Sequence, residues 1–228
     1  MTNYPFTVTR ETVRLPWSNR HLQIIRPESI DPLLDNAIVD PEQNLPYWAE
    51  LWPSGIALAD LVLSTPGLVA ERECLELGCG LGVTAAAAML SGSQLTVTDY
   101  APEALALCHD NCLANTGRAP LAEQVNWRQQ PLTVSRREPH SWGVVLAADV
   151  LYERRDIEPL ISGVDELLAP DGLLLLAEPG RDVASVFLDR LRDDGWVIHS
   201  HSHPGPWPDP KDEGVVVGLH RISRSPKD

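Results

Sequence analysis

Short apolar segments alternate with longer amphipathic or alanine-rich segments through the central part of the chain. Most of the apolar segments are rich in Leu, Val or other β-branched residues, and several end at a glycine or an acid. This pattern is typical of strands that are buried on both faces of a sheet. The predicted strands are the segments 74–80, 94–100, 125–129, 142–150 and 172–180.

The segments between these strands carry helix signals. One of them opens with Pro102 and Glu103 and stops at Gly117, which are typical residues for helix termini. Helices are predicted at 82–90, 102–117, 156–169 and 182–195, and a Pro-Asp-Gly turn follows the third. Because strands and helices alternate, we expect a parallel, doubly wound sheet.

The end of the chain departs from this alternation. Two further strands are predicted at 196–203 and 214–222, joined by a proline-rich loop without a helix. Two strands joined in this way form an antiparallel hairpin. The predicted fold class is therefore α/β, a doubly wound and mostly parallel seven-stranded sheet that ends in an antiparallel hairpin.

The first 45 residues form a separate unit in this interpretation. Segments 12–17 and 21–29 predict a small hairpin, and a proline- and acid-rich stretch follows them. We expect residues 1–45 to be an N-terminal extension that covers the ligand face of a main domain spanning 46–228. A helix is predicted to begin near Pro53.

Charge and cysteine content narrow the possible partners. The net charge of −14 disfavours binding to the phosphates of nucleic acid. No run of about 18 apolar residues predicts a membrane helix, and the first residues lack a signal-peptide pattern. The four cysteines form no C-x-x-C pair. We expect a cytoplasmic protein with reduced thiols and buried cysteines.

The stretch ELGCGLGVT, at 76–84, predicts a ligand site. Gly78 and Gly80 follow the first strand directly, where bare backbone can approach a ligand. The spacing is G-x-G-x-G, whereas a nicotinamide fingerprint is G-x-G-x-x-G. Glu76 would repel a pyrophosphate, but it suits S-adenosylmethionine (SAM), which carries an ammonium and a sulfonium. Asp99 ends the second strand, where an acid can bind ribose hydroxyls, although it could instead cap the next helix.

With these features, the chain from about residue 46 onwards resembles the seven-stranded SAM-dependent methyltransferases. The stretches PYWAELWPSGIALADLV and AADVLYE are similar to segments of protein-lysine methyltransferases, notably those that act on the electron transfer flavoprotein β subunit. The resemblance implies SAM as cofactor. The residues that it implies for the cofactor pocket, together with Glu76, are Trp52, Gly78, Gly80, Asp99 and Ala148. It implies that Asp149 and Tyr152 are catalytic and lie beside the transferred methyl group.

Two departures from the family pattern limit the prediction. The loop after the third strand lacks the usual acidic or tryptophan residue for adenine, so Gln130 or Leu132 is expected in that place. An Asn-Pro-Pro-Tyr motif, which accompanies methylation of adenine or glutamine, is absent.

The predicted function is N-methylation of lysine in a protein substrate. Asp149 is interpreted as an orienting acceptor rather than a base, because a carboxylate raises the pKa of a nearby amine. A small-molecule N- or O-methyltransferase and a non-catalytic SAM-binding protein are the alternatives. Asp149 could also be a helix cap, and Tyr152 and Trp52 could be packing residues. No metal site is predicted, because the alternating His199, His201 and His203 fit a solvated strand face better.

Overall fold

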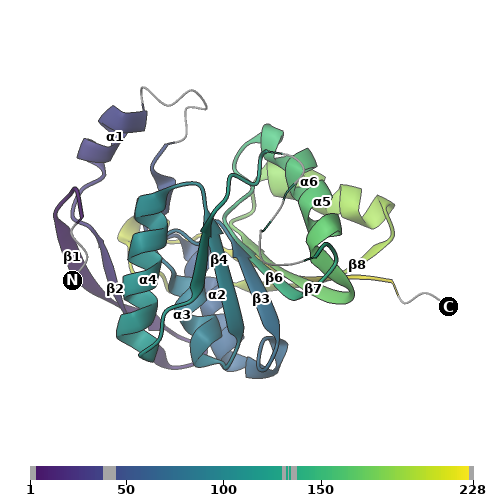
Figure 1. The fold of residues 1–228 in the computed structure, drawn as a ribbon, viewed down its shortest axis with the longest axis horizontal. Helices are drawn as coiled ribbons and strands as arrows, with labels where there is room; N and C mark the ends of the chain where they lie inside the picture. Colours follow the sequence, from purple (N-terminus) through teal and green to yellow (C-terminus); the bar gives the residue numbers. More distant parts are fainter. Residues whose placement is uncertain (1–3, 38–44, 130–131, 133, 135–137, 226–228) are drawn as a thin grey trace.

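A seven-stranded sheet forms the centre of the molecule (Figure 1). The structure is a computed structural model that describes residues 4–37, 45–129, 132, 134 and 138–225. The strand order is β5-β4-β3-β6-β7-β9-β8. The strands are β3 (Glu73–Leu77), β4 (Gln94–Asp99), β5 (Leu121–Gln124), β6 (Trp142–Ala148), β7 (Leu168–Glu178), β8 (Trp196–His203) and β9 (Val217–Arg224). β9 is antiparallel to both neighbours and the other pairs are parallel, so the predicted fold class is confirmed.

Helices cover both faces of this sheet. They are α2 (Pro53–Ser64), α3 (Val83–Leu90), α4 (Pro102–Thr116), α5 (Ile157–Leu167) and α6 (Asp182–Asp193). The short helix α1 (Asp31–Ala37) lies apart from the sheet, at the upper left of Figure 1. Short 3-10 helices are η1 (Tyr47–Ala49), η2 (Pro66–Leu68), η3 (Arg154–Asp156) and η4 (Pro210–Asp212). Among the described helices, none combines the length and the apolar character that crossing a bilayer requires.

Alternate residues of the central strands pack into two separate hydrophobic clusters. On β6, Val144 and Leu146 join a cluster with α2, α3 and α4, while Val145 and Ala147 join a cluster with α5 and α6. Successive side chains of a strand point to opposite faces, so a strand buried on both faces must be apolar throughout. This explains why the central strands are nearly continuous apolar runs.

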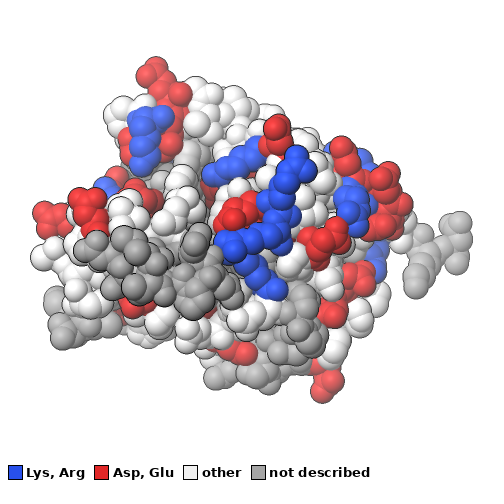
Figure 2. All heavy atoms as spheres, turned by 90° about the horizontal axis from the view of Figure 1, so that it is seen from above, with Lys and Arg blue, Asp and Glu red and all other residues white. Residues whose placement is uncertain are grey.

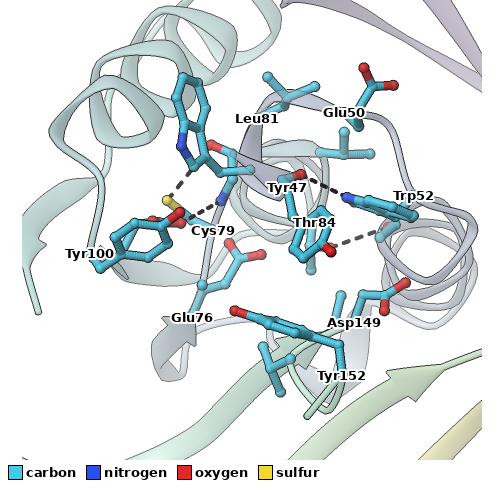
Figure 3. A pocket seen from close by; sticks show the side chains of 18 of the residues that line it. Tyr47, Glu50, Trp52, Glu76, Cys79, Leu81, Thr84, Tyr100, Asp149 and Tyr152 are labelled. Carbon is cyan, nitrogen blue, oxygen red and sulfur yellow. Dashed lines mark hydrogen bonds between the residues drawn. The ribbon is translucent and has the colours of Figure 1, made fainter. Parts of the chain in front are cut away.

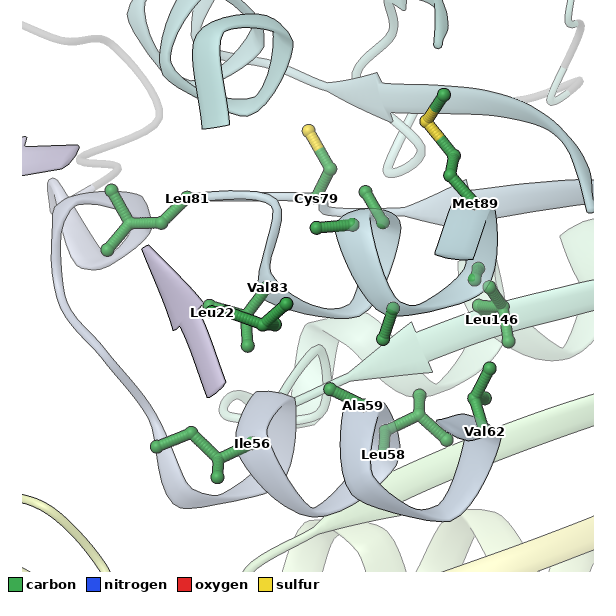
Figure 4. Close-up of a cluster of buried hydrophobic side chains, with 14 of the residues drawn as sticks. Leu22, Ile56, Leu58, Ala59, Val62, Cys79, Leu81, Val83, Met89 and Leu146 are labelled. Atoms are coloured by element: carbon green, nitrogen blue, oxygen red, sulfur yellow. The ribbon is translucent and has the colours of Figure 1, made fainter. Parts of the chain in front are cut away.

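A separate hairpin flanks the helical layer. Its strands are β1 (Val8–Leu15) and β2 (Arg20–Pro27). Leu22 packs in the same cluster as Ile56, Val83 and Leu146, so the hairpin shares the core of the main sheet (Figure 4). The Asn111 side chain on α4 also bonds the main chain of β2, accepting from Ile25 N at 2.6 Å and donating to Ile25 O at 2.8 Å.

The predicted position of the third strand is wrong. β5 spans Leu121–Gln124, at the edge of the sheet, and the predicted segment 125–129 follows it as a turn. Val125 N still donates to Asp99 O, but Asn126 Oδ1 then accepts from Arg128 N at 3.1 Å. Such an Asx bond offers the backbone a local alternative to strand pairing.

Two smaller expectations also need correction. β7 begins at Leu168, before the expected Pro-Asp-Gly turn, and a register shift opposite Trp142 and Val144 absorbs the extra residues. The histidine face is not uniformly solvated. His199 and His201 are exposed, whereas His203 is fully buried, 3.2 Å from an oxygen of Asp60.

Candidate active site

A pocket lies at the carboxyl ends of β3, β4 and β6. β3 pairs with both β4 and β6, and the chain order reverses there, which is where ligands bind in doubly wound sheets. The pocket wall includes the residues that the sequence predicted for the cofactor and for catalysis, apart from those expected at the adenine. These are Trp52, Glu76, Gly78, Gly80, Asp99, Ala148, Asp149 and Tyr152.

The glycine loop follows β3 and wraps tightly against its neighbours. Gly80 has a φ of 47°, and a Cβ there would come within 3.3 Å of Trp48 O. At Gly82, which precedes α3, a Cβ would lie 2.7 Å from the sulfur of Cys108. The loop therefore needs glycine both for backbone conformation and for close packing against η1 and α4.

Asp99 joins the glycine loop to the end of β4. It is 3% exposed, and its carboxylate accepts from Gly80 N and from Ala101 N, each at 3.0 Å. Burial raises the pKa of Asp99 to about 6, although these backbone N–H groups favour its charged form. The N-cap residue of α4 is Ala101, so Asp99 is not the helix cap that the sequence left open.

Glu76 is the least satisfied acid of the pocket. Its side chain is 2% exposed, and Oε2 has no hydrogen-bond partner. Burial, together with the nearby Asp99, raises the pKa of Glu76 well above its ordinary value. Figure 3 shows Glu76 directed into the cavity. Buried polar atoms without a partner are rare. A carboxylate kept in this state fits a cationic ligand group, so the residues present fit SAM.

A second cavity of about 440 Å³ adjoins the first. The two share Leu45, Tyr47, Trp52, Asp149 and Tyr152. The Tyr47 ring stands edge-on to Trp52 and to Tyr152, with centroid separations of 6.0 and 5.5 Å. Trp52 Nε1 also donates to Tyr47 O at 2.8 Å. The three rings form an aromatic wall that leads to the Asp149 carboxylate.

Asp149 is held firmly where the two cavities meet. It follows β6 with a φ of 59°, a conformation that Asp tolerates better than most residues. Its N–H donates to Ala177 O at 2.9 Å. Ser54 Oγ donates to Oδ2 at 3.0 Å, and Arg181 Nη1 donates to Oδ1. Both carboxylate oxygens are therefore fixed, each by a single donor.

Tyr152 lines both cavities from the loop after β6. Its hydroxyl is directed toward Glu76 (Figure 3), and the Arg128 guanidinium lies 5.4 Å from its ring centroid. Burial raises the pKa of Tyr152 to about 12, so the group is a neutral hydroxyl near pH 7. A neutral hydroxyl can both donate and accept a hydrogen bond.

Several wall residues were not predicted from the sequence. Trp48, Tyr100 and Trp127 line the first cavity, and Arg181 lines the second. Trp127 was overlooked because its segment was interpreted as a strand. The prediction for Leu132 is wrong, since it is buried in the cluster of α5 and α6 and lies against Gly163. Gln130, the other residue predicted for adenine, lies outside the described residues.

Comparisons with known proteins agree with this geometry. The profile of the lysine methyltransferase family matches residues 40–194. Over 138 residues the chain is 34% identical to electron transfer flavoprotein beta subunit lysine methyltransferase from Danio rerio, covering 60% of this chain and 51% of that protein. Over 178 residues it is 29% identical to EEF1A lysine methyltransferase 3 from Mus musculus, covering 76% and 71%.

A solved structure supports the fold. The chain superimposes on magnesium protoporphyrin IX methyltransferase from Synechocystis PCC 6803 with bound SAM, with a TM-score of 0.56 and 15% identity, covering 75% of this chain and 78% of that one. The chain spans about half the length of the flavoprotein-methylating relative from Danio rerio. The family match covers most of this chain, and so the chain belongs to the lysine methyltransferase family and has the fold of the SAM-dependent methyltransferases.

Proposed function

We propose that this chain transfers a methyl group from SAM to the ε-amino group of a lysine in a protein substrate. The observation that carries the proposal is the junction of two cavities with different chemistry. One contains Glu76, a buried carboxylate without a partner at Oε2. The other has an aromatic wall and reaches the first at Asp149 and Tyr152. A cationic methyl donor and an amine acceptor would meet at that junction.

SAM, when bound, supplies a methyl group made reactive by its sulfonium. Glu76 would attract the ammonium of its amino-acid part, and Asp99 would accept from the ribose hydroxyls. The backbone at Gly78 and Gly80 would lie against the ligand. Trp52 and Ala148 would complete the pocket, although Trp52 also faces the acceptor side.

The acceptor cavity suits a lysine side chain in two respects. Its aromatic wall of Tyr47, Trp52 and Tyr152 can pack against the four-carbon stem. Asp149 can accept a hydrogen bond from the amine at its inner end. Because the reaction depends mainly on aligning the amine nitrogen, these contacts would act through position. Burial of the amine also lowers its pKa and so frees the electron pair.

The same proposal covers the partner and its location. We expect a cytoplasmic location for this chain, a protein with an accessible lysine as its partner, and neither nucleic acid nor membrane as a further partner. The net charge is −14, and on the face seen in Figure 2 basic side chains lie interspersed with acidic ones. A nucleic-acid site would need a continuous basic surface. Residues 1–45 remain proposed as the extension on the substrate side of the domain 46–228.

The test is transfer of tritium from methyl-labelled SAM into a cell extract that is then separated by size. The parent protein should label protein bands. Asp149→Asn and Tyr152→Phe should lose at least about a hundredfold in rate, the scale expected for a misplaced reactant. Their affinity for S-adenosylhomocysteine should stay within a few-fold by calorimetry, because the lost contacts concern the acceptor.

Asp189→Asn is the matched control for Asp149→Asn, since Asp189 is an exposed aspartate that also pairs with an arginine. It should transfer methyl groups at the parental rate. Label confined to small molecules would replace the lysine assignment by the small-molecule alternative. Parental rates in both site variants would mean that the acceptor binds elsewhere.

A further inference from the structure

Arg181 is a basic residue of the acceptor cavity to which the proposed function assigns no role. It is the N-cap residue of α6 and lines the cavity together with Asp149. Its Nη1 donates to Asp149 Oδ1, and the two side chains are 33% and 8% exposed. The guanidinium therefore sits between solvent and a nearly buried carboxylate, at the place where an amine substrate would enter.

A buried acid fixes the backbone position of Arg181. Glu178, at the end of β7, accepts from Gly180 N at 2.6 Å and from Arg181 N at 3.2 Å. Its other oxygen lies 3.2 Å from His220 Nε2. Burial opposes ionisation of Glu178, but bonds from His220 and Gly180 outweigh it and lower its pKa. Because Glu178 is charged and accepts these backbone hydrogen bonds, it fixes the backbone from which the Arg181 side chain extends.

Pairing with Arg181 changes what Asp149 does to an amine. A lone carboxylate in a cavity of low polarity stabilises an ammonium and raises the pKa of the amine. Methyl transfer needs the neutral amine, because an ammonium has no free electron pair. A carboxylate that is already neutralised by a guanidinium still has lone pairs that accept a hydrogen bond. It stabilises the substrate ammonium much less than a lone carboxylate does, so the amine loses its proton more easily.

Resting on the proposed function, we propose that Arg181 is a positioning residue that neutralises and orients Asp149, so that the acceptor binds as a free amine. The lysine ammonium releases its proton to solvent, and its nitrogen then donates an N–H to the Asp149 carboxylate with the electron pair left free. Ser54 holds the second carboxylate oxygen and fixes the direction from which the amine is accepted.

Other charged groups face Asp149 but do not replace Arg181. Glu153 and Arg155 line the same cavity and pair with each other at 2.9 Å. Asp212 on η4 interacts electrostatically with Asp149, and Glu50 lines the neighbouring cavity. These groups are acids or an arginine already paired with one. Among the described residues, only Arg181 forms an ion pair with Asp149.

The test compares the rate of methyl transfer with pH for the parent and for Arg181→Met, with cell-extract protein as acceptor and tritiated SAM as donor. Arg181→Met should lose about tenfold or more in rate near pH 7. Its profile should shift by about one pH unit or more toward alkaline values, because the unpaired carboxylate now retains the ammonium. Arg181→Lys should restore part of the rate and part of the shift.

Two further variants separate positioning from a structural role. In an Asp149→Asn background, Arg181→Met should cause no further alkaline shift, since the charge to be neutralised is gone. Arg192→Met is the matched control, because Arg192 pairs with Asp189 at 2.6 Å on the surface, and it should leave the profile unchanged. Affinity for S-adenosylhomocysteine should stay within about threefold of the parental value in every Arg181 variant.

The outcomes distinguish this proposal from the proposed function. Three results would overturn the role of Arg181 and leave the proposed function intact. They are an equal loss of rate at all pH values, no loss of rate, and an alkaline shift that persists without the Asp149 charge. If the parent protein labels only small molecules, the lysine assignment fails, and the same profiles measured with that acceptor still decide the role of Arg181. No label in any fraction would contradict both.

Discussion

Two buried carboxylates, one on α2 and one on β3, differ in whether the protein itself satisfies them. Asp60 on α2 is fully buried and accepts from Trp17 N, Ser18 N and Ser18 Oγ at 2.6–2.8 Å, with His203 Nε2 at 3.2 Å. Glu76 on β3 is 2% exposed, and its Oε2 has no partner. The pKa of Asp60 is lowered, because these bonds outweigh its burial, whereas the pKa of Glu76 is raised by burial and by Asp99.

The difference teaches which acid serves the fold and which is kept for a ligand. Asp60 joins the turn of the β1–β2 hairpin to α2 and to the end of β8, so its charge is used entirely inside the protein. Gly205 N donates to His203 Nδ1 at 3.2 Å, which leaves Nε2 to donate its proton to Asp60. Glu76 carries an unsatisfied oxygen into a cavity, which costs stability unless a ligand compensates.

The largest effect is expected from breaking the satisfied acid. Asp60→Ala leaves two backbone N–H groups, one hydroxyl and His203 without their acceptor. The free energy of unfolding should fall by about 3–5 kcal/mol, as for other broken buried pairs. Urea unfolding at pH 7 measures this.

The pH dependence sharpens the same prediction. Because the folded pKa of Asp60 is lowered, its contribution is complete above the unfolded value of 3.8 and is lost as the pH falls through the folded value. The variant should therefore lose less stability in acid than the parent does. Asp189→Ala, at an exposed aspartate, is the control. A loss as small as that of the control would contradict the role of Asp60.

A smaller effect, on binding rather than stability, is expected from Glu76→Gln. The neutral amide keeps the shape but cannot attract a cation. Affinity for S-adenosylhomocysteine should fall by about 1.5–3 kcal/mol, the scale of a hydrogen bond to a charged group. Stability of the free protein should stay equal or rise, because an acid whose pKa burial raises destabilises the fold near pH 7. Calorimetry and urea unfolding together test both parts.

The result for Glu76 is most informative beside that for Asp60. If Glu76→Gln unfolds as readily as Asp60→Ala and the folded fraction binds with parental affinity, the two acids have the same role and the comparison fails.

The smallest expected effect is a proton released on binding. The pKa of Asp99 in the free protein is about 6, and accepting from ribose hydroxyls favours its charged form. Binding of S-adenosylhomocysteine at pH 6 should release a fraction of a proton, measured by calorimetry in two buffers with different ionisation enthalpies. Because a raised acid pKa means that the folded state holds its proton longer, Asp99 also lowers stability as the pH rises from 3.8 toward 6. Proton release that persists unchanged in Asp99→Asn would assign it to another group.

Local pattern determined much of the fold and of the candidate site. Apolar runs and helix termini are properties of neighbouring residues, so most strands and helices were predicted close to their observed ranges. The glycine loop and Asp99 stand directly at strand ends, and parallel strands bring those ends to one edge of the sheet. Resemblance to known methyltransferases supplied the roles expected for Trp52, Asp149 and Tyr152.

Local chemistry also explains where prediction failed. The residues Val125 to Arg128 alternate between apolar and polar, whereas Leu121–Gln124 does not, so the pattern favoured the wrong segment as the partner of β4. The Asx turn at Asn126 ends the strand, and Leu121–Gln124 is the segment that pairs with β4. With that choice, Trp127 leaves the sheet and joins the cavity wall.

Only the tertiary structure decided the charge partners. Arg181 lies 32 residues from Asp149, and His203 lies 143 residues from Asp60. Nothing in the local pattern distinguishes Arg181 from the other arginines, or His203 from His199 and His201. The sequence by itself determined which elements form and which acids stand at strand ends. Whether a buried acid is satisfied or left for a ligand depends on groups that meet only after folding, because hydrogen bonds and ion pairs act over a few ångströms in space and not along the chain.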